Sequence, residues 1–157
     1  MQFIGFAELQ IDPKQRLAIP AKYRNQWNLE RDGGAWVCIP WPTGLLRLYT
    51  EKMFEHLSKS GSLASDSLTP TADAAEVEAM LFGWAERLEM DSAGRVTLPK
   101  SHLELTRLGN EVVMVGARNR LEVRSRASWE ADKLRNFQRL PELVQRIEAE
   151  RRVGRGD

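Results

Sequence analysis

The sequence predicts an α+β protein built from two tandem copies of one module. Residues 11–20, Ile-Asp-Pro-Lys-Gln-Arg-Leu-Ala-Ile-Pro, return 79 positions later as residues 90–99, Met-Asp-Ser-Ala-Gly-Arg-Val-Thr-Leu-Pro. Downstream of each pattern, similar apolar segments follow in the same order, at 36–39 and 112–115. Amphipathic helical patterns separate and follow the two copies. We therefore expect two related halves that share one hydrophobic core.

The repeat divides the chain into four parts. The offset between matching positions falls from 79 to 75, because Leu46-Arg47-Leu48 matches Leu121-Glu122-Val123, so short loop deletions separate the copies. The expected parts are a first repeat over 1–57, a linker and helix over 58–83, a second repeat over 84–127, and a C-terminal helical segment and tail over 128–157.

Each copy begins with two strands around a tight connection. In the first copy, alternation of apolar and polar residues predicts these strands at 6–11 and 16–19. Pro20 and Pro99 follow the second strand of each copy at a position where proline costs a helix no hydrogen bond, which predicts helices at 21–28 and 100–106. Turn residues then predict strands at 35–39 and 45–49, and Thr50 is a candidate cap for a helix that ends near Leu57.

The two tight turns differ in one residue. Gly94 stands where a three-residue hairpin loop places a residue in the left-handed region, whereas the first copy has Gln15 there. Pro13 fixes a negative φ earlier in the first turn. The first turn is therefore expected to be the more strained of the two.

The remaining helices are predicted from apolar spacing. Serine-rich residues 58–70 are typical of a linker, and a helix over 71–83 follows, because Val77, Met80, Leu81 and Trp84 recur at i, i+3, i+4 and i+7. After the last strand, Ser128 is expected to start a helix that runs to Arg139. Pro141 is expected to open another helix, with Leu143, Val144 and Ile147 on one side.

Bulk properties exclude several classes of protein. The net charge is +1, so nucleic-acid binding would need a local basic surface. The single Cys38 excludes an intramolecular disulfide framework and a multi-cysteine metal site, and favours a reducing compartment. The N-terminal residues lack the pattern of a secretion signal, and no segment approaches the length of a membrane span, so we expect a soluble cytoplasmic protein.

The sequence offers little support for an enzyme. His56 and His102 stand alone, without the spacing of paired metal ligands, and Cys38 lies between apolar residues as a buried core thiol would. Gly33-Gly34 lacks the Lys-Ser/Thr of a phosphate-binding loop. We predict no enzymatic activity, no cofactor, no metal and no small-molecule substrate.

The repeated Asp-x-x-x-Arg turns are the candidate functional site. Asp12 and Arg16 flank the first turn, as Asp91 and Arg95 flank the second. In one interpretation each Asp and Arg form an exposed ion pair that contributes about 0–1 kcal/mol to stability. In the other, the Asp carboxylate accepts backbone N–H groups and shapes the turn, while the Arg points to an anionic partner. Around the turns lie further basic residues, Lys14, Lys22, Arg24, Lys100 and Arg107. A strand pair with a basic tip fits the DNA major groove, but a solvated face explains the same residues.

A second group of arginines, at 118, 120, 124 and 126, surrounds the last strand. The interleaved Glu122 weakens it as a phosphate track, so an oligomer contact or plain solubility explains it equally well.

The paired Asp-x-x-x-Arg turns, the start Phe3-Ile4-Gly5 and the run from Arg16 to Arg24 resemble the MraZ family of bacterial transcriptional regulators over about 5–140. The resemblance implies an AbrB/MazE-like fold, in which the repeats 1–57 and 84–127 are AbrB-like (SpoVT-AbrB) units. Their swapped hairpins then form a barrel-like pseudo-dimer with peripheral helices. The family's first motif usually has Gly where this chain has Gln15.

The resemblance also implies a function. Chains of this family form ring-like homo-oligomers and bind double-stranded DNA with direct repeats upstream of the division and cell-wall gene cluster, including their own gene, commonly as repressors. Arg16 and Arg95 are then the DNA-facing residues, with Lys14 as a phosphate contact. Asp12, Asp91 and Gly94 shape the turns, and the protein is cytoplasmic and nucleoid-associated.

The alternative is a protein-interaction module of the AbrB type, acting as an antitoxin or scaffold. A long featureless tail would favour an antitoxin, whereas residues 128–152 are amphipathic.

Overall fold

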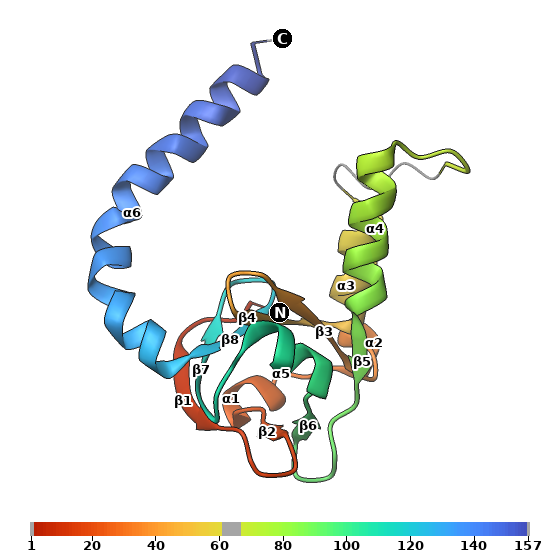
Figure 1. Ribbon diagram of the computed structural model, residues 1–157, viewed down its shortest axis with the longest axis vertical. Helices are drawn as coiled ribbons and strands as arrows, with labels where there is room; N and C mark the ends of the chain where they lie inside the picture. The colour runs from red at the N-terminus through yellow and green to blue at the C-terminus, as the bar shows by residue number, and fades with distance from the viewer. Residues whose placement is uncertain (1, 61–66, 157) are drawn as a thin grey trace. The chain divides into compact units, whose positions relative to one another are not determined.

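The computed structural model of the protein describes residues 2–60 and 67–156 (Figure 1). These residues form two units, one that extends to Arg126 and one that starts at Ala127. The predicted linker 58–70 falls in part on residues 61–66, which lie outside the described residues. The first unit contains all the strands, and the second consists of helix.

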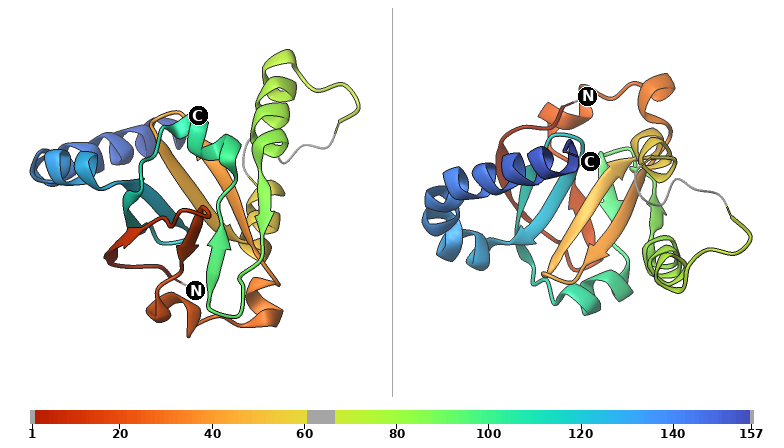
Figure 2. Two further views of the ribbon diagram at one scale, coloured as in Figure 1. Left: turned by 60° about the horizontal axis from the view of Figure 1, so that its bottom comes forward. Right: turned by 90° about the horizontal axis from the view of Figure 1, so that it is seen from above.

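The strands form one large and one small antiparallel sheet (Figure 2). Six strands pair in the order β1-β7-β8-β4-β3-β5, and β2 pairs with β6 alone. The bounds are β1 Phe6–Gln10, β2 Arg16–Ala18, β3 Trp36–Trp41, β4 Leu45–Thr50, β5 Glu86–Leu88, β6 Arg95–Thr97, β7 Glu111–Gly116 and β8 Leu121–Ser125. The α+β class expected from the sequence is confirmed.

The predicted tight connections are present, but the strands they join take partners from the other half of the chain. β1 pairs with β7, β5 pairs with β3, and β2 pairs with β6. Simple hairpins of β1 with β2 and of β5 with β6 are therefore wrong. The exchange places Leu17 opposite Val96 with both side chains fully buried, which a hairpin within one copy would not do.

The strand pairing also differs from a closed barrel. Within the described residues β1 and β5 remain the two edges of the large sheet. The short strands β2 and β6 separate from it and form their own two-stranded ribbon, so the hydrogen bonds do not run around a closed cylinder.

The pairing repeats the internal symmetry of the sequence. In the small sheet Arg16 faces Thr97 and Ala18 faces Arg95. These two pairs are equivalent, because Arg16 matches Arg95 and Ala18 matches Thr97 in the repeated pattern. Two further backbone bonds obey the same symmetry, because Ile19 N–H donates to Gly94 O and Leu98 N–H donates to Gln15 O, at 3.0 and 2.8 Å. Each turn therefore receives a hydrogen bond from the strand that follows the other turn.

The core lies between the sheets and the short helices. Trp36 is fully buried, with ring centroids 5.0 Å from Trp27 and 5.7 Å from Phe3. Leu46 and Leu48 of β4 and Leu121 of β8 are also fully buried where the two halves meet. Removing the apolar surface of these side chains from water is the main favourable contribution to folding.

The first predicted helix, 21–28, is wrong in extent. The structure has two short helices there, α1 Ala21–Arg24 and α2 Leu29–Asp32. Asn28 is extended, and its side chain caps α2 by accepting from Arg31 N–H, while Asp32 accepts from Asn28 N–H at 2.8 Å. Asn is a strong N-cap residue, so it starts a new helix rather than continuing the old one.

Other helices agree with the sequence. α3, Glu51–Ser58, is capped by Thr50, whose hydroxyl accepts from Met53 N–H at 3.2 Å, as predicted. α4, Ala72–Trp84, and α5, Lys100–Thr106, lie within one residue of their expected bounds. Phe82 of α4 packs against Phe54 of α3, with ring centroids 5.5 Å apart.

The C-terminal prediction of two helices is wrong. One helix, α6, runs from Arg126 to Gly154 with Pro141 inside it. An interior proline removes a backbone bond and costs a helix about 3 kcal/mol. Ion pairs one turn apart join Asp132 to Arg135 before the proline and Glu142 to Arg146 after it, which supports the helix on both sides.

The two turns place a residue in the left-handed region, as the sequence predicts. Gln15 has φ 65° and Gly94 has φ 75°. The arginine of α1 explains why glycine occupies only the second turn. Arg24 donates from Nε to Ile19 O at 2.7 Å, and its Cδ would lie 2.2 Å from a Cβ at position 94. Gly94 is therefore required by its own backbone and by the side chain packed on it.

We expect Gly94→Ala to lower the free energy of unfolding by about 1–3 kcal/mol, because a left-handed alanine is strained and Arg24 must move. Gln15→Gly should change it by less than about 1 kcal/mol, because relief of strain and the entropy of glycine oppose each other. Urea unfolding measures both. Gly109→Ala is the control, since nothing lies within 4 Å of its added Cβ. Equal losses of unfolding free energy in Gly94→Ala and Gly109→Ala would contradict the requirement for glycine at position 94.

His102 of α5 is not isolated, in contrast to the expectation from its sequence position. It is 1% exposed, its Nε2 lies 2.6 Å from Trp84 O, and its Nδ1 lies 3.3 Å from Cys38 Sγ. Because a carbonyl only accepts, Nε2 carries the proton and Nδ1 accepts from the thiol. Burial lowers the pKa of His102 and raises the pKa of the Cys38 thiol. Cys38 is a buried thiol, as predicted.

A neutral buried histidine makes stability depend on pH. As the pH falls below about 6.5, the ordinary pKa of histidine, the unfolded chain takes up a proton that folded His102 resists, so the free energy of unfolding should fall as the solution is made more acidic. Well above pH 6.5 the contribution of neutral His102 is complete. Denaturant unfolding of the wild type, His102→Gln and the control His56→Gln tests this. The dependence should shrink only in His102→Gln, and an unchanged slope in that variant would refute the assignment.

Candidate nucleic-acid interface

The first turn is closed by the carboxylate of Asp12. Its Oδ1 accepts from the backbone N–H groups of Lys14 and Arg16 at 2.9 and 2.8 Å. Its Oδ2 accepts from Arg16 Nε at 2.6 Å. One carboxylate thus shapes the turn and holds the arginine that follows it.

The second turn repeats this arrangement. Asp91 Oδ1 accepts from Ala93 N–H and Arg95 N–H, both at 2.9 Å, and Oδ2 accepts from Arg95 Nε at 2.9 Å. The two interpretations of the Asp-x-x-x-Arg pattern are therefore compatible, because each Asp forms an ion pair and also accepts backbone bonds.

These bonds keep both carboxylates ionised. The N–H of the arginine four residues later is the main reason that the pKa of Asp12 and the pKa of Asp91 lie below their ordinary value. A permanently charged carboxylate in a fixed turn holds the guanidinium in one orientation.

Both arginines lie on one face of the β2–β6 ribbon. In an antiparallel pair, residues that face each other point to the same side. Leu17 and Val96 face each other and point into the core, so Arg16 and Arg95, one position away on their strands, lie on the outer face at diagonal positions. Their side chains are 30% and 36% exposed.

Each guanidinium keeps donors for a ligand. Asp12 and Asp91 occupy the Nε atoms, and within the described residues the Nη groups of Arg16 and Arg95 make no hydrogen bond. An arginine has five N–H donors in a planar fork, so the outward edge of each remains available to an anion or a base edge.

Other basic residues near the turns differ in their availability. Lys14 is exposed in the first turn, where the second turn has Ala93. Arg24 donates to Ile19 O, Lys22 Nζ lies 3.3 Å from Phe6 O, and Lys100 Nζ lies 3.9 Å from Glu104. Arg107, at the end of α5, is exposed and left-handed, with φ 55°. Lys14, Arg16 and Arg95 are the basic residues that lie in the turns and the ribbon themselves.

The arginines around β8 do not form a phosphate track. Glu122 is 2% exposed and pairs with Arg120 at 2.9 Å and with Arg124 at 2.5 Å, while Arg47 Nε lies 3.7 Å away. Burial alone would raise the pKa of Glu122, but Arg124 and Arg120 outweigh burial and lower the pKa. Arg47 also stacks on Trp41, 4.1 Å from the ring centroid. The sequence did not reveal that this glutamate is a buried centre of charge.

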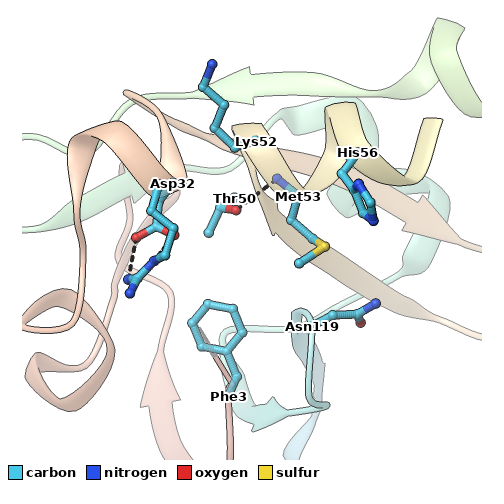
Figure 3. A pocket seen from close by; sticks show the side chains of 8 residues that line it. Phe3, Asp32, Thr50, Lys52, Met53, His56 and Asn119 are labelled. Carbon is cyan, nitrogen blue, oxygen red and sulfur yellow. Dashed lines mark hydrogen bonds and ion pairs between the residues drawn. The ribbon is translucent and has the colours of Figure 1, made fainter. Parts of the chain in front are cut away.

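A small cavity of about 190 Å³ contains the other histidine (Figure 3). Asp32 and His56 lie at opposite sides of it, with Thr50 and Met53 between them (Figure 3). Asp32 is bound by Arg31 at 2.8 Å and by Asn28 N–H. Thr50 caps α3. Asp32 and Thr50 of this cavity thus have structural partners.

Residues 2–60 and 67–156 contain neither a metal-binding cluster nor a membrane-spanning helix. No group of three His, Cys, Asp or Glu side chains is placed to hold a metal ion. No helix in this part of the chain is long and apolar enough to cross a membrane.

Comparison with known proteins agrees with the repeated turns. Residues 81–147 match the family described as "MraZ protein, putative antitoxin-like". Proteins named "Transcriptional regulator MraZ" are similar to this chain over most of its length. The protein from Thiobacillus denitrificans is 35% identical over 82% of this chain and 84% of the relative, and that from Chromobacterium violaceum is 38% identical over 81% and 83%. The chain belongs to the MraZ family.

Proposed function

We propose that this protein is a DNA-binding transcriptional regulator that contacts DNA through Arg16 and Arg95. The observation that carries the proposal is the position of two arginines, each held by its own Asp, on the exposed face of one two-stranded ribbon. A two-stranded ribbon is narrow enough to enter the major groove. The names of the relatives support the same role.

In the proposed complex the Nη groups of Arg16 and Arg95 donate to base edges. Arginine bidentate to guanine is the commonest specific contact in the major groove. Asp12 and Asp91 act as positioning residues, because they fix each guanidinium before DNA arrives and so reduce the entropy lost on binding. Lys14, at the turn tip, contacts a phosphate.

The finer parts of the proposal follow from the family resemblance. The protein binds direct repeats upstream of the division and cell-wall gene cluster, including its own gene, as a repressor in the cytoplasm at the nucleoid. The repeats 1–57 and 84–127 form an AbrB-like pseudo-dimer, and several chains assemble into a ring. A ring lets several ribbons engage successive repeats, which raises avidity without new contacts.

A protein-interaction role is the second candidate. It is favoured by the exposed apolar side chains of α6, among them Phe137 at 73% exposure. Such a role does not use Arg16 and Arg95, so one set of variants separates the two functions.

We expect Arg16→Ala and Arg95→Ala each to weaken binding to direct-repeat DNA by about 1–3 kcal/mol, because each loses a bidentate contact. Each should lower the free energy of unfolding by no more than about 1 kcal/mol, since each ion pair is exposed. Fluorescence anisotropy with repeat and scrambled duplexes at two salt concentrations measures affinity, and urea unfolding measures stability.

Arg87→Ala is the matched control, because Arg87 is also exposed and paired with carboxylates, Glu51 and Glu89, but lies on β5 away from the ribbon. Arg87→Ala removes one positive charge, as Arg16→Ala does, but it removes no proposed DNA contact. It should therefore leave the preference for the direct-repeat duplex over the scrambled duplex intact. Equal losses of affinity in Arg87→Ala and Arg16→Ala would show a non-specific charge effect. Failure of the folded wild type to bind either duplex would favour the protein-interaction role.

A further inference from the structure

A second cavity lies where α3 and α4 stand beside the strands β3 and β4 (Figure 1). Its volume is about 300 Å³, at the lower end of the range for small-molecule sites. Two strands and two helices supply mainly aromatic and aliphatic side chains to it, among them Ile39, Trp41, Tyr49, Phe54, Leu81 and Phe82. The cavity thus offers an apolar ligand walls on several sides.

Arg47 of β4 is the charged side chain in the described lining of this cavity. Leu46 and Leu48 are fully buried in the core, so Arg47 between them points to the opposite face of the sheet. On that face its strand neighbours are Ile39 of β3 and Glu122 of β8. The register of the sheet therefore carries one guanidinium to the apolar cavity.

The guanidinium of Arg47 lacks hydrogen-bond partners. Its Nε is buried without a partner, and Glu122 Oε2, at 3.7 Å, is too distant for a hydrogen bond. Glu122 is already bound by Arg120 at 2.9 Å and by Arg124 at 2.5 Å. Within residues 2–60 and 67–156 the Nη groups of Arg47 also make no hydrogen bond. One carboxylate thus faces three guanidinium groups, and Arg47 keeps both charge and donors.

Trp41 holds this guanidinium in place. The guanidinium carbon of Arg47 lies 4.1 Å from the centroid of the Trp41 ring, and the Arg47 side chain is 25% exposed. A guanidinium that stacks on a ring by its face donates hydrogen bonds from its edges. Because the group is already fixed, an anion that binds it loses little entropy to ordering.

The carboxylates nearby leave the cavity positive. Its described lining contains no Asp or Glu. Glu122 is engaged by two arginines, and Glu78, one turn before Phe82 on α4, is outside the lining. The described lining also contains no His or Cys, so it supplies no general base. These side chains can hold a ligand but are not suited to converting it.

The lining favours a carboxylate over other anions. A guanidinium matches the two oxygens of a carboxylate with two parallel hydrogen bonds. A phosphate monoester carries close to two negative charges at neutral pH, and one guanidinium compensates one of them. The aromatic walls add stabilisation only when the anion carries an apolar body.

We propose that this cavity binds a small apolar carboxylic acid in its ionised form. The carboxylate accepts hydrogen bonds from the Nη groups of Arg47, and the apolar body lies against Trp41, Phe54 and Phe82. The site goes beyond the proposed contact with DNA, because Arg16 and Arg95 take no part in its described lining.

Isothermal titration calorimetry of the full chain tests the ligand class. Benzoate and 3-phenylpropionate are the probes, and benzamide and 3-phenylpropionamide are their neutral counterparts. At least one acid should bind with one-to-one stoichiometry, and its amide should bind about 10-fold more weakly or worse, because the charge-assisted bonds are lost. Phenyl phosphate should also bind more weakly than the acid. Binding of neither acid, or equal affinity for acid and amide, would overturn the proposal.

Arg47→Met tests the residue that holds the anion. It should weaken binding of the acid about 10-fold or more and leave binding of the amide unchanged. Arg120→Met is the matched control, because it removes another guanidinium beside Glu122 from a position outside the described lining. Circular dichroism confirms that both variants fold. Equal losses of acid affinity in the two variants would show a general effect of charge and refute the site.

Phe82→Ala tests the apolar wall. Phe82 is 44% exposed, so the variant should fold, and it should weaken the binding of acid and amide alike, by about 3- to 10-fold. Unchanged affinity for the acid would place the ligand elsewhere and refute the cavity as its site.

The DNA assay separates this inference from the proposed function. Arg47→Met should bind the direct-repeat duplex as wild type does, because the ribbon is untouched. Loss of acid binding together with normal DNA binding supports a separate ligand site. A folded wild type that binds the acid but not DNA would refute the DNA contact and leave this site standing.

Discussion

The pairing of β2 with β6 is the constraint on which the rest of the first unit depends. It joins the two copies of the repeated pattern through Leu17 and Val96, both fully buried, and through symmetric bonds from Ile19 to Gly94 and from Leu98 to Gln15. Because each turn accepts a bond from the strand beyond the other turn, neither turn has its full set of partners within one copy. The two halves therefore fold as one unit around a common core.

This constraint also positions the candidate site. The ribbon directs Leu17 and Val96 inward, so Arg16 and Arg95 must lie outside, and Asp12 and Asp91 then hold them by the Nε edge. An exposed ion pair contributes little to stability. Its consequence is geometric, since two fixed guanidinium groups at diagonal positions form a rigid pattern of donors.

Elsewhere the fold uses its charges internally. Glu122 pairs with both Arg120 and Arg124 at the junction of the two halves, where β4 meets β8. Arg24 covers Gly94 and binds Ile19 O, which ties α1 to the second turn. On a chain of net charge +1, Lys14, Arg16 and Arg95 form a local group of cations at the turns and the ribbon.

The sequence by itself determined the local elements whose causes are local. The repeated pattern predicted both tight turns, Thr50 predicted a helix start, and Gly94 and Gln15 marked the left-handed positions, because backbone sterics and capping act within a few residues. The strand exchange and the open sheet were decided by the tertiary structure, because strand partners are chosen by burial of Leu17 and Val96 across 79 positions. The contact of His102 with Cys38, the burial of Glu122 and the continuation of α6 through Pro141 were also decided there. The first two features depend on residues that are distant in the sequence, and the third depends on whether the rest of the helix offsets the cost of its proline. A local sequence pattern determines neither.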